Sequence, residues 1–478
     1  MKLRTAALAG FRFQAYLKLF SVASHQIGSL VLAVLLTPRD FAVVGLATVF
    51  VGFSSGIADF GLGSAVIQHR DDFRMALQTG ATLRLLLSIA AMVAVALTAP
   101  FISNWYNTVE LTGVMWALSF LLFLQFAGFA SRVSLTKLLR FKQAFIPEVA
   151  GGAATSFSCI GLALVGWSYW SLVAGSLIGA AVNVIGLYLL SPWRIVWVLN
   201  RNMATKLVRF GAPLVIAGVL ASLFGSFGVV VLGAINLADV GYYLFAYTWA
   251  VSVPMGIHTS IDNVMFPIYS AMEMDKDRIR AAYLRTSGEL ARLIIPLDVF
   301  FIAAAPSFIL ALVGSKWANS IPMLQLLGAV GFVLVLSSTY HSFAVSLGHP
   351  REITLYNVLG LVVSVPLTLA LAPPLRGVGV ALSLLIAEAF LLCWATWRTE
   401  VILHGTTRRL SVLYAVPAVA SAGSGASVWV VAGLLPVSLP TLLLEVCVGA
   451  AMYCAAMQAL TRGRFIAQTR ELMLSFFG

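Results

Sequence analysis

Residues 15–67 of this chain read AYLKLFSVASHQIGSLVLAVLLTPRDFAVVGLATVFVGFSSGIADFGLGSAVI. Two long apolar runs flank a short polar turn, Thr37-Pro38-Arg39-Asp40. Each run is long enough to supply the roughly 20 helical residues that cross the hydrocarbon core of a bilayer. The stretch therefore predicts two membrane-spanning helices joined by a tight turn. The first run lacks the small-residue cleavage pattern of a signal peptide, so we expect it to be a mature helix.

The same pattern fills nearly the whole chain. Hydrophobic residues make up 60% of the sequence, charged residues make up 10%, and the mean hydropathy is +0.96. Such a composition does not fit a soluble domain of this length. The sequence predicts an all-α integral membrane protein with fourteen transmembrane segments, near residues 15–36, 41–67, 77–99, 111–135, 146–165, 171–190, 213–235, 241–266, 290–312, 323–345, 353–372, 378–396, 413–434 and 441–459.

The basic residues are distributed very unevenly between the two sides of this predicted bundle. With both termini in the cytoplasm, 27 of the 30 Lys and Arg residues fall in cytoplasmic gaps or helix ends, and only Arg39, Lys316 and Arg376 fall outside. This bias is typical of membrane insertion, which retains cationic loops in the cytoplasm. We expect a multi-pass protein of the bacterial inner (cytoplasmic) membrane. The net charge of +12 follows from this topology and from contact with anionic lipid headgroups, so no nucleic-acid partner is expected.

Sequence motifs of cofactor or metal chemistry are missing. The four cysteines lie within apolar segments without metal-ligand spacing, and there is no phosphate-binding loop or H-E-x-x-H sequence. We therefore expect neither a catalytic residue nor a bound cofactor or metal. Coupling to a proton or sodium gradient stays open.

The chain contains an internal repeat. Leu36–Gly45 and Ile235–Tyr243 each join two long apolar helices through a tight turn, and aligning Asp40 with Asp239 gives an offset of 199 residues. An even number of crossings separates the turns, which predicts two parallel-repeat six-helix lobes. We expect an N-lobe at residues 1–199, a C-lobe at 200–400 with an amphipathic linker, and helices 13 and 14 with a cytoplasmic tail at 401–478.

Six short fragments carry a family resemblance. They are Leu35–Phe41, Asp59–Gln68, Arg140–Lys142, Phe266–Pro267, Gly314–Ala318 and Leu347–Pro350. In this order they resemble the bacterial polysaccharide transporters, the Wzx-type oligosaccharide flippases of the MOP superfamily. Ala42 departs from the family pattern, which usually has glycine there. The likeness spans most of residues 1–350 and weakens beyond.

The resemblance implies a V-shaped, MATE-like pair of lobes that open alternately to either side. It also implies a substrate, an undecaprenyl-diphosphate-linked oligosaccharide carried to the outer leaflet for exopolysaccharide, capsule or O-antigen assembly. The expected partners are membrane lipids, together with a polymerase and a chain-length regulator of the same pathway.

Cations within or near apolar segments are candidates for binding the diphosphate. They are Lys18, Arg84, Arg132 and Arg292. Arg84 and Arg292 are offset by 208 residues, close to the repeat, so they are expected on the same helix of each lobe. Paired guanidinium groups suit multidentate hydrogen bonding to phosphate oxygens. The plainer alternative is that these side chains reach out to the lipid headgroups.

Other polar side chains inside the apolar segments are further candidate site residues. Gln26, Asp59 and His258 are candidate substrate contacts, and Asp298, Glu388 and Asp262 are candidates for ion coupling. Polar groups of this kind are costly in hydrocarbon and rarely face lipid. Structural alternatives remain open, including a capping role for Asp59 and local backbone bonding for Asp262.

Two other functions were weighed against flipping. Export of a cationic drug by the multidrug branch of the same superfamily favours an acidic cavity, whereas this chain has more segment-end cations than carboxylates. A membrane polysaccharide polymerase or ligase would need a sizeable outward loop, and the outward gaps here are short. The sequence thus favours a lipid-linked oligosaccharide flippase that is not an enzyme.

Overall fold

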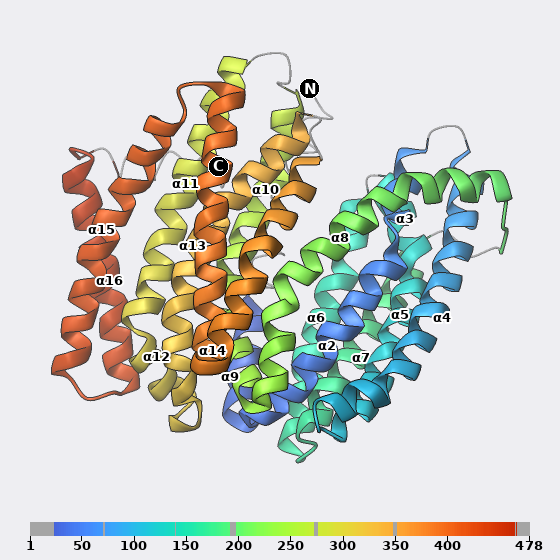
Figure 1. The fold of residues 1–478 in the computed structure, drawn as a ribbon, viewed down its shortest axis with the longest axis horizontal. Coiled ribbons are helices and arrows are strands. Elements are labelled where there is room, and N and C mark those ends of the chain that lie inside the picture. Colours follow the sequence, from blue (N-terminus) through green and yellow to red (C-terminus); the bar gives the residue numbers. More distant parts are fainter. Residues whose placement is uncertain are drawn as a thin grey trace. The chain divides into compact units, whose positions relative to one another are not determined.

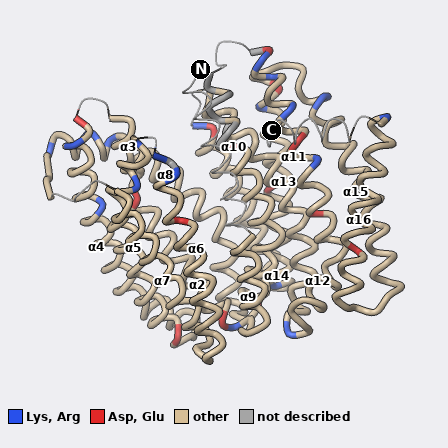
Figure 2. The backbone as a smooth tube through the Cα atoms, turned by 180° about the vertical axis from the view of Figure 1, so that it is seen from behind, with Lys and Arg blue, Asp and Glu red and all other residues tan. Residues whose placement is uncertain are grey.

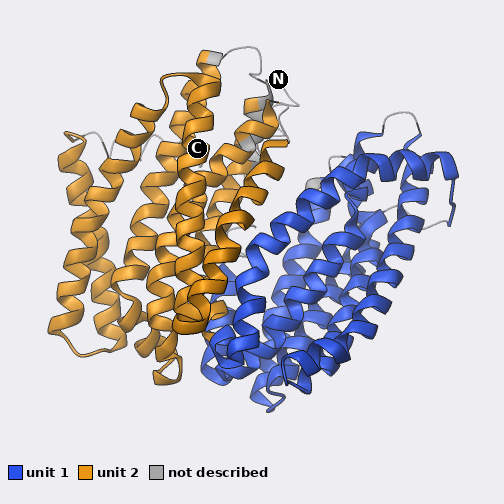
Figure 3. Cartoon of the chain, in the orientation of Figure 1, with its two compact units in different colours: residues 1–241 blue, residues 242–478 orange. Residues whose placement is uncertain are grey.

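The protein is an α-helical membrane protein in the computed structural model, which describes residues 23–69, 72–138, 140–191, 197–271, 276–347, 351–463 and 465. The chain divides into two compact units, residues 1–241 and 242–478 (Figure 3). Among the described residues, ten helices are long and apolar enough to cross a membrane, or eleven if one bent pair is counted as a span. The predicted multi-pass helical architecture is confirmed, and the count of fourteen stays a prediction.

Unit 1 is built from packed helices (Figure 1). Helix α6 packs along α7, α4 packs along α5, and α2 contacts α4, α5 and α8. The helices are Ala23–Leu35, α2 (Pro38–Asp59), α3 (Leu62–Gln68), α4 (Phe73–Trp105), α5 (Glu110–Lys137), α6 (Phe141–Leu164), α7 (Tyr169–Leu190) and α8 (Arg201–Ile235).

The turn before α2 is held by a capping box. Thr37 Oγ1 accepts a hydrogen bond from the Asp40 backbone N–H at 3.3 Å, and the Asp40 carboxylate accepts one from the Thr37 N–H at 2.8 Å. Pro38 starts the helix, where its missing N–H costs nothing. The repeat-related turn is capped differently, because the Asn236 side chain accepts from the Ala238 N–H at 3.0 Å. Thr37 is therefore the N-cap of α2, Asp40 completes the capping box, and Asn236 accepts the corresponding hydrogen bond in the second turn.

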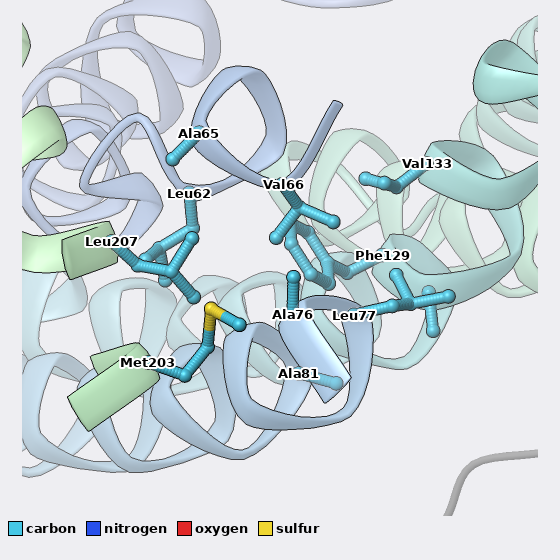
Figure 4. Close-up of a cluster of buried hydrophobic side chains, with 11 residues drawn as sticks. Leu62, Ala65, Val66, Ala76, Leu77, Ala81, Phe129, Val133, Met203 and Leu207 are labelled. Carbon is cyan, nitrogen blue, oxygen red and sulfur yellow. The ribbon is translucent and has the colours of Figure 1, made fainter. Parts of the chain in front are cut away.

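A tightly packed apolar cluster joins α3, α4, α5 and α8 at one end of unit 1 (Figure 4). Its members are almost fully buried, so removing them from water and lipid contact fixes the positions of four helices at once. The cluster consists of Leu62, Ala65, Val66, Ala76, Leu77, Ala81, Phe129, Ala130, Val133, Met203 and Leu207.

Elsewhere in the unit, Tyr106 donates a hydrogen bond to the Val230 carbonyl of α8 at 3.0 Å, and burial raises the pKa of this phenol to about 12.

Unit 2 is also helical, and its last two helices pack against α11 and α12. A core of aromatic residues, including Tyr269, Tyr283, Tyr340 and Phe343, lies among α10, α11 and α13. The elements are α9 (Leu237–Tyr247, which starts in unit 1), the π-helix η1 (Thr248–Ser252), α10 (Val253–Ala271), α11 (Lys276–Ala303), α12 (Ala305–Leu312), the 3₁₀-helix η2 (Ser315–Ser320), α13 (Ile321–Ser346), α14 (Arg351–Leu403), α15 (Thr407–Leu434) and α16 (Leu439–Leu460).

Helix α14 contains a break. Arg376 has φ 53° and ψ −130°, which no α-helix contains, and Pro373 and Pro374 precede it. The predicted segments 353–372 and 378–396 lie on either side of this break. The helix pair α11 and α12 is bent by 69° and together covers the predicted segment 290–312.

The boundary between the compact units is at residue 241, whereas the repeat predicted a division at residue 199. Helix α8 belongs to unit 1 because it packs against α2, α3 and α4. Residues 201–235 form one helix, so the expected amphipathic linker is its first part. The division of the chain into repeat lobes stays a prediction.

The surfaces of both units are typical of membrane proteins. Figure 2 shows most acidic and basic residues near helix ends, with long uncharged stretches between them. Large apolar side chains are exposed, among them Phe101, Trp105, Phe157, Leu189 and Trp429. Exposure of this kind is expected where hydrocarbon replaces water as the solvent.

Candidate functional site

A cavity lined by both apolar and charged side chains lies in unit 1. Its volume is about 470 Å³, and α2, α4, α5, α6 and α7 all contribute to its walls. This volume falls within the range of protein sites for small molecules. The lining residues are Asp59, Arg84, Leu121, Leu124, Gln125, Gly128, Phe129, Arg132, Gly151, Gly152, Thr155, Ser176, Gly179, Ala180, Asn183, Val184 and Leu187.

Arg84 is the buried cation of the cavity. It lies on α4 and only 4% of the residue is exposed. Its Nη1 is 3.0 Å from Asp59 Oδ1, and its Nη2 is 3.5 Å from Gln125 Oε1. The same Gln125 oxygen accepts a hydrogen bond of 2.6 Å from Ser55 Oγ, which holds the amide in place. The Nε of Arg84 has no hydrogen-bond partner among the residues that the structure describes. Asp59 and Gln125 therefore do not use all the donors of this guanidinium.

Arg132 is the second cation of the cavity and lies on α5. Its Nη1 is 3.2 Å from Glu148 Oε2, and its Nη2 is 3.5 Å from Asn183 Oδ1 of α7. The Arg132 side chain is 47% exposed, so its ion pair is partly screened. The lining therefore contains two guanidinium groups and one carboxylate, with amide and hydroxyl groups from Gln125, Asn183, Thr155 and Ser176 beside them.

The structure brings three of the sequence-predicted site residues to this cavity: Asp59, Arg84 and Arg132. Gln26 is buried in the helix Ala23–Leu35 and does not line it. Lys18 lies outside the described residues. The sequence reasoning did not select Gln125 or Asn183 as site residues. The sequence feature that could have identified these two residues is an amide side chain within an apolar segment.

Arg292, the predicted counterpart of Arg84, lies on α11 in unit 2. Its Nη1 is 3.2 Å from Oε1 of Glu289, one turn earlier on the same helix. Its backbone carbonyl accepts a hydrogen bond of 2.8 Å from Tyr453 of α16. Arg292 thus has an ion-pair partner inside its own unit, and its pairing with Arg84 around one ligand stays a prediction.

A second set of polar residues is buried in unit 2. Glu388 of α14 accepts hydrogen bonds from Tyr356 Oη at 2.8 Å and from Ser337 Oγ at 3.5 Å. His258 of α10 is 3.3 Å from Ser338 Oγ, measured from its Nε2, and Asp262 follows it by one turn. The Glu388 carboxylate is therefore hydrogen-bonded within the protein. The Nδ1 of His258 is buried without a partner among the described residues, and Asp262 is partly buried.

Asp298 of α11 differs from these groups. It is fully buried, and neither carboxylate oxygen has a hydrogen-bond partner among the described residues. A Cβ added to Gly331 of α13 would lie 2.9 Å from Asp298 Oδ2 and 2.2 Å from the Ala250 carbonyl, so the carboxylate approaches the π-helix η1. Interruptions of this kind in α-helices are frequent at functional sites.

The donor set of the unit 1 cavity suits an oxyanion. Guanidinium groups donate paired hydrogen bonds to phosphate or carboxylate, and neighbouring amides and hydroxyls suit sugar hydroxyl groups. Among the described residues, no group of three or more His, Cys, Asp or Glu side chains could hold a metal ion. The geometry is that of a binding site for an anionic, polar ligand.

These features define a polytopic α-helical membrane protein with an internal anion-compatible site. The chain belongs to the polysaccharide biosynthesis protein family, whose sequence profile (Polysacc_synt_3) matches residues 31–322. The resemblance that the six fragments indicated is thereby confirmed at the level of the family.

Similar proteins agree with this assignment. The chain is 23% identical over 395 residues to the lipopolysaccharide biosynthesis protein WzxC of Escherichia coli (strain K12), covering 81% of this chain and 80% of that protein. It is 27% identical over 325 residues to the succinoglycan biosynthesis transport protein ExoT of Rhizobium meliloti (strain 1021), covering 66% of this chain and 65% of that protein. The fold is similar to that of the lipid II flippase MurJ in an inward closed conformation, with a TM-score of 0.79 and 12% identity, over 94% of this chain and 99% of that chain.

Proposed function

We propose that this protein is a flippase that moves undecaprenyl-diphosphate-linked oligosaccharide repeat units across the bacterial inner membrane by alternating access. The transported units serve the assembly of an exopolysaccharide, a capsule or an O-antigen. The observation that carries the proposal is the cavity of unit 1, where the buried Arg84 and the half-exposed Arg132 point to an anionic ligand. The printed names of WzxC, a lipopolysaccharide biosynthesis protein, ExoT, a succinoglycan biosynthesis transport protein, and MurJ, a lipid II flippase, support a transport role in polysaccharide assembly.

The chemistry of the substrate explains why such a cavity is needed. A lipid-linked repeat unit presents a diphosphate, a polar glycan and a long apolar tail. The diphosphate and the sugars cannot cross hydrocarbon uncompensated, because an unpaired charge there costs several kcal/mol. The tail can remain in lipid. A cavity of about 470 Å³ with two guanidinium groups can compensate the diphosphate while its amides and hydroxyls contact the first sugar.

The charge of the cavity argues against export of a cationic drug. Its lining contains Arg84 and Arg132 but only one carboxylate, Asp59, which is itself paired with Arg84. A cationic ligand would have to compete with Arg84 for Asp59, because the lining contains no second carboxylate. An anionic headgroup is therefore the ligand that these side chains favour.

The finer topology forms part of the proposal. We infer fourteen crossings, two parallel six-helix repeats with two additional C-terminal helices, and both termini in the cytoplasm. Arg292, His258 and Gln26 are proposed contacts for the glycan or diphosphate, and Lys18 a further cation near the cytoplasmic surface. Asp298, Glu388 and Asp262 are proposed for ion coupling. A polymerase and a chain-length regulator of the same pathway are the proposed protein partners.

Reconstitution of the purified protein into vesicles tests the function directly. Vesicles loaded with undecaprenyl-diphosphate-linked repeat units should show protein-dependent transfer of the glycan from one leaflet to the other. Deletion of the gene should cause the same lipid-linked unit to accumulate on the cytoplasmic side. Transfer that does not depend on the protein, or deletion without accumulation, would contradict the proposal.

Arg132→Ala is expected to weaken flipping only moderately. The side chain is 47% exposed and its pair with Glu148 is partly screened, so the loss should be about threefold, as expected of a solvent-accessible charge contact. Initial flipping rates should be measured at low and high salt. The deficit should shrink as salt increases, whereas a salt-independent loss of a hundredfold would place Arg132 among the buried contacts instead.

The predicted orientation can be checked with two single cysteines. Lys316 and Arg408 are both exposed, and the charge distribution places Lys316 outside and Arg408 in the cytoplasm. In intact cells, a membrane-impermeant maleimide should label Lys316→Cys and leave Arg408→Cys unlabelled until the membrane is opened. The parent chain with its four native cysteines provides the background. The reverse labelling pattern would invert the topology.

A further inference from the structure

Helix α2 ends at Asp59 in an unusual backbone break. The next two residues, Phe60 and Gly61, are both left-handed, with φ 48° and φ 60°, and α3 begins at Leu62. Glycine adopts this conformation readily, but a bulky residue such as Phe60 does so only when its surroundings impose it. The break therefore separates two rigid helices at a defined point, directly beside a residue of the cavity.

The break lies directly against α8. A Cβ added to Gly211 of α8 would lie 2.1 Å from the Phe60 carbonyl oxygen, so backbone meets backbone without an intervening side chain. A Cβ on Gly61 would lie 2.8 Å from Leu214 Cδ1, and Leu62 and Leu207 belong to the same buried cluster (Figure 4). In packing this close, the break cannot change shape unless α8 adjusts as well.

The two partners of the Arg84–Asp59 ion pair differ in exposure. The Arg84 side chain is 5% exposed, whereas the Asp59 side chain is 56% exposed. The buried guanidinium needs a counter-charge, because an uncompensated cation in the membrane interior is costly. The half-exposed carboxylate can regain contact with water when the pair opens, whereas the buried guanidinium cannot. Asp59 is thus the partner that can leave.

We propose that Asp59 is the internal counter-ion of Arg84, and that a phosphate oxyanion binding at Arg84 displaces it and so releases the Phe60–Gly61 break and α8. This inference rests on the proposed function, since it takes the diphosphate of the lipid carrier as the displacing ligand. The diphosphate has more acceptor oxygens and more charge than one carboxylate, so it replaces Asp59 favourably. Ligand binding in the cavity thereby changes the packing of α8. Helix α8 is followed in sequence by Asn236 and then by α9, which continues into unit 2.

The Arg132–Glu148 pair provides an internal contrast. Both of its side chains are substantially exposed, at 47% and 37%. Glu148 lies inside the continuous helix α6, whose backbone has no such break next to it. Loss of the Glu148 contact would leave α6 unchanged. The coupling of an ion pair to a backbone break is therefore a property of Asp59 in this cavity.

Binding of inorganic pyrophosphate to the full-length protein in phosphatidylcholine nanodiscs tests the proposal. Asp59→Asn removes the competing carboxylate while keeping its shape, so it should bind pyrophosphate about fivefold more tightly than the wild type. Asp59→Glu should bind like the wild type. Glu110→Gln is a matched control, because Glu110 forms an ion pair of 3.0 Å with Arg39 away from the cavity. Its affinity should not change.

Hydrogen–deuterium exchange gives a measurement that would not respond to the ligand in this way if Asp59 had only a structural role. Pyrophosphate should speed exchange in residues 60–68 of the wild type. In Asp59→Asn these residues should exchange fast without the ligand and show no further response to it. If Asp59→Asn binds no tighter and its exchange responds to pyrophosphate as in the wild type, the counter-ion role is wrong.

Two further arms separate this proposal from the proposed function. If the wild type does not bind pyrophosphate, or binds it equally well after Arg84→Ala, the anion site itself is wrong and both proposals fall. If binding requires Arg84 and Asp59→Asn changes nothing, only the counter-ion role falls. Nanodiscs with added phosphatidylglycerol identify the source of the phosphate. Competition by this lipid would assign the site to phospholipid headgroups and overturn the assignment to the carrier diphosphate.

Discussion

Replacing Arg84 with alanine is expected to lower the initial rate of flipping in reconstituted vesicles by roughly tenfold or more, because hydrogen bonds to charged groups contribute 1.5–3 kcal/mol. Arg84 is the more deeply buried of the two cations that line the cavity, and its Nη1 is 3.0 Å from Asp59 Oδ1. In cells, the variant should accumulate lipid-linked units on the cytoplasmic side and lower polymer output. The protein should still insert and fold, since removing a buried charge also removes its desolvation cost.

Two companion variants sharpen this test. Arg84→Lys keeps the charge but loses the planar, multidentate donor set, so it should recover only part of the rate. Arg39→Ala is the matched control, because Arg39 is exposed and pairs with Glu110 outside the cavity. It should flip at the wild-type rate. Wild-type transport by both Arg84 variants would show that the cavity does not hold the diphosphate.

Asp298→Asn is expected to abolish the part of flipping that an ion gradient drives. A buried carboxylate without hydrogen-bond partners is stable in a membrane only when it is neutralised by a proton or a cation. Asparagine has the same shape but cannot take up or release a proton, and it attracts cations weakly. Transport by this variant should therefore proceed at the rate seen without a gradient. The measurement is the flipping rate with proton or sodium gradients imposed and collapsed in turn.

Glu445→Gln provides a buried control for Asp298. Glu445 is fully buried on α16, and its carboxylate accepts a hydrogen bond of 2.7 Å from Ser307 of α12. Its role in packing the last two helices should survive the substitution, and the gradient dependence should be unchanged. Gradient stimulation that persists in Asp298→Asn would exclude Asp298 from coupling. Loss of stimulation in Glu388→Gln alone would then shift the role to that residue.

The sequence predicted the helical segments well because hydropathy is a local property. Residues 41–67 were expected to cross the membrane, and α2 and α3 cover them. The tight turn at Thr37-Pro38-Arg39-Asp40 was also expected, and the structure adds its capping box. The break at Phe60–Gly61 and the π-helix η1 were not anticipated, because both depend on packing against neighbouring helices.

The candidate site was predicted in part. Arg84, Arg132 and Asp59 were selected because charged side chains in apolar segments are costly and need a polar surrounding. Their convergence with Gln125 and Asn183 could not be read from the chain, since the positions come from α2, α4, α5 and α7. The proposed pairing of Arg84 with Arg292 rested on spacing in the repeat, and each of the two has an ion-pair partner in its own unit.

The sequence by itself determined that this is a multi-pass helical membrane protein of a polysaccharide biosynthesis family, because apolar length and motif order are properties of short segments. Only the tertiary structure decided which polar groups share a cavity, that Asp298 has no hydrogen-bond partner among the described residues, and that α8 packs with the first unit. The physical reason is that each helix is stable by its own hydrogen bonds in a membrane, whereas the choice of facing surfaces depends on side-chain packing between distant segments.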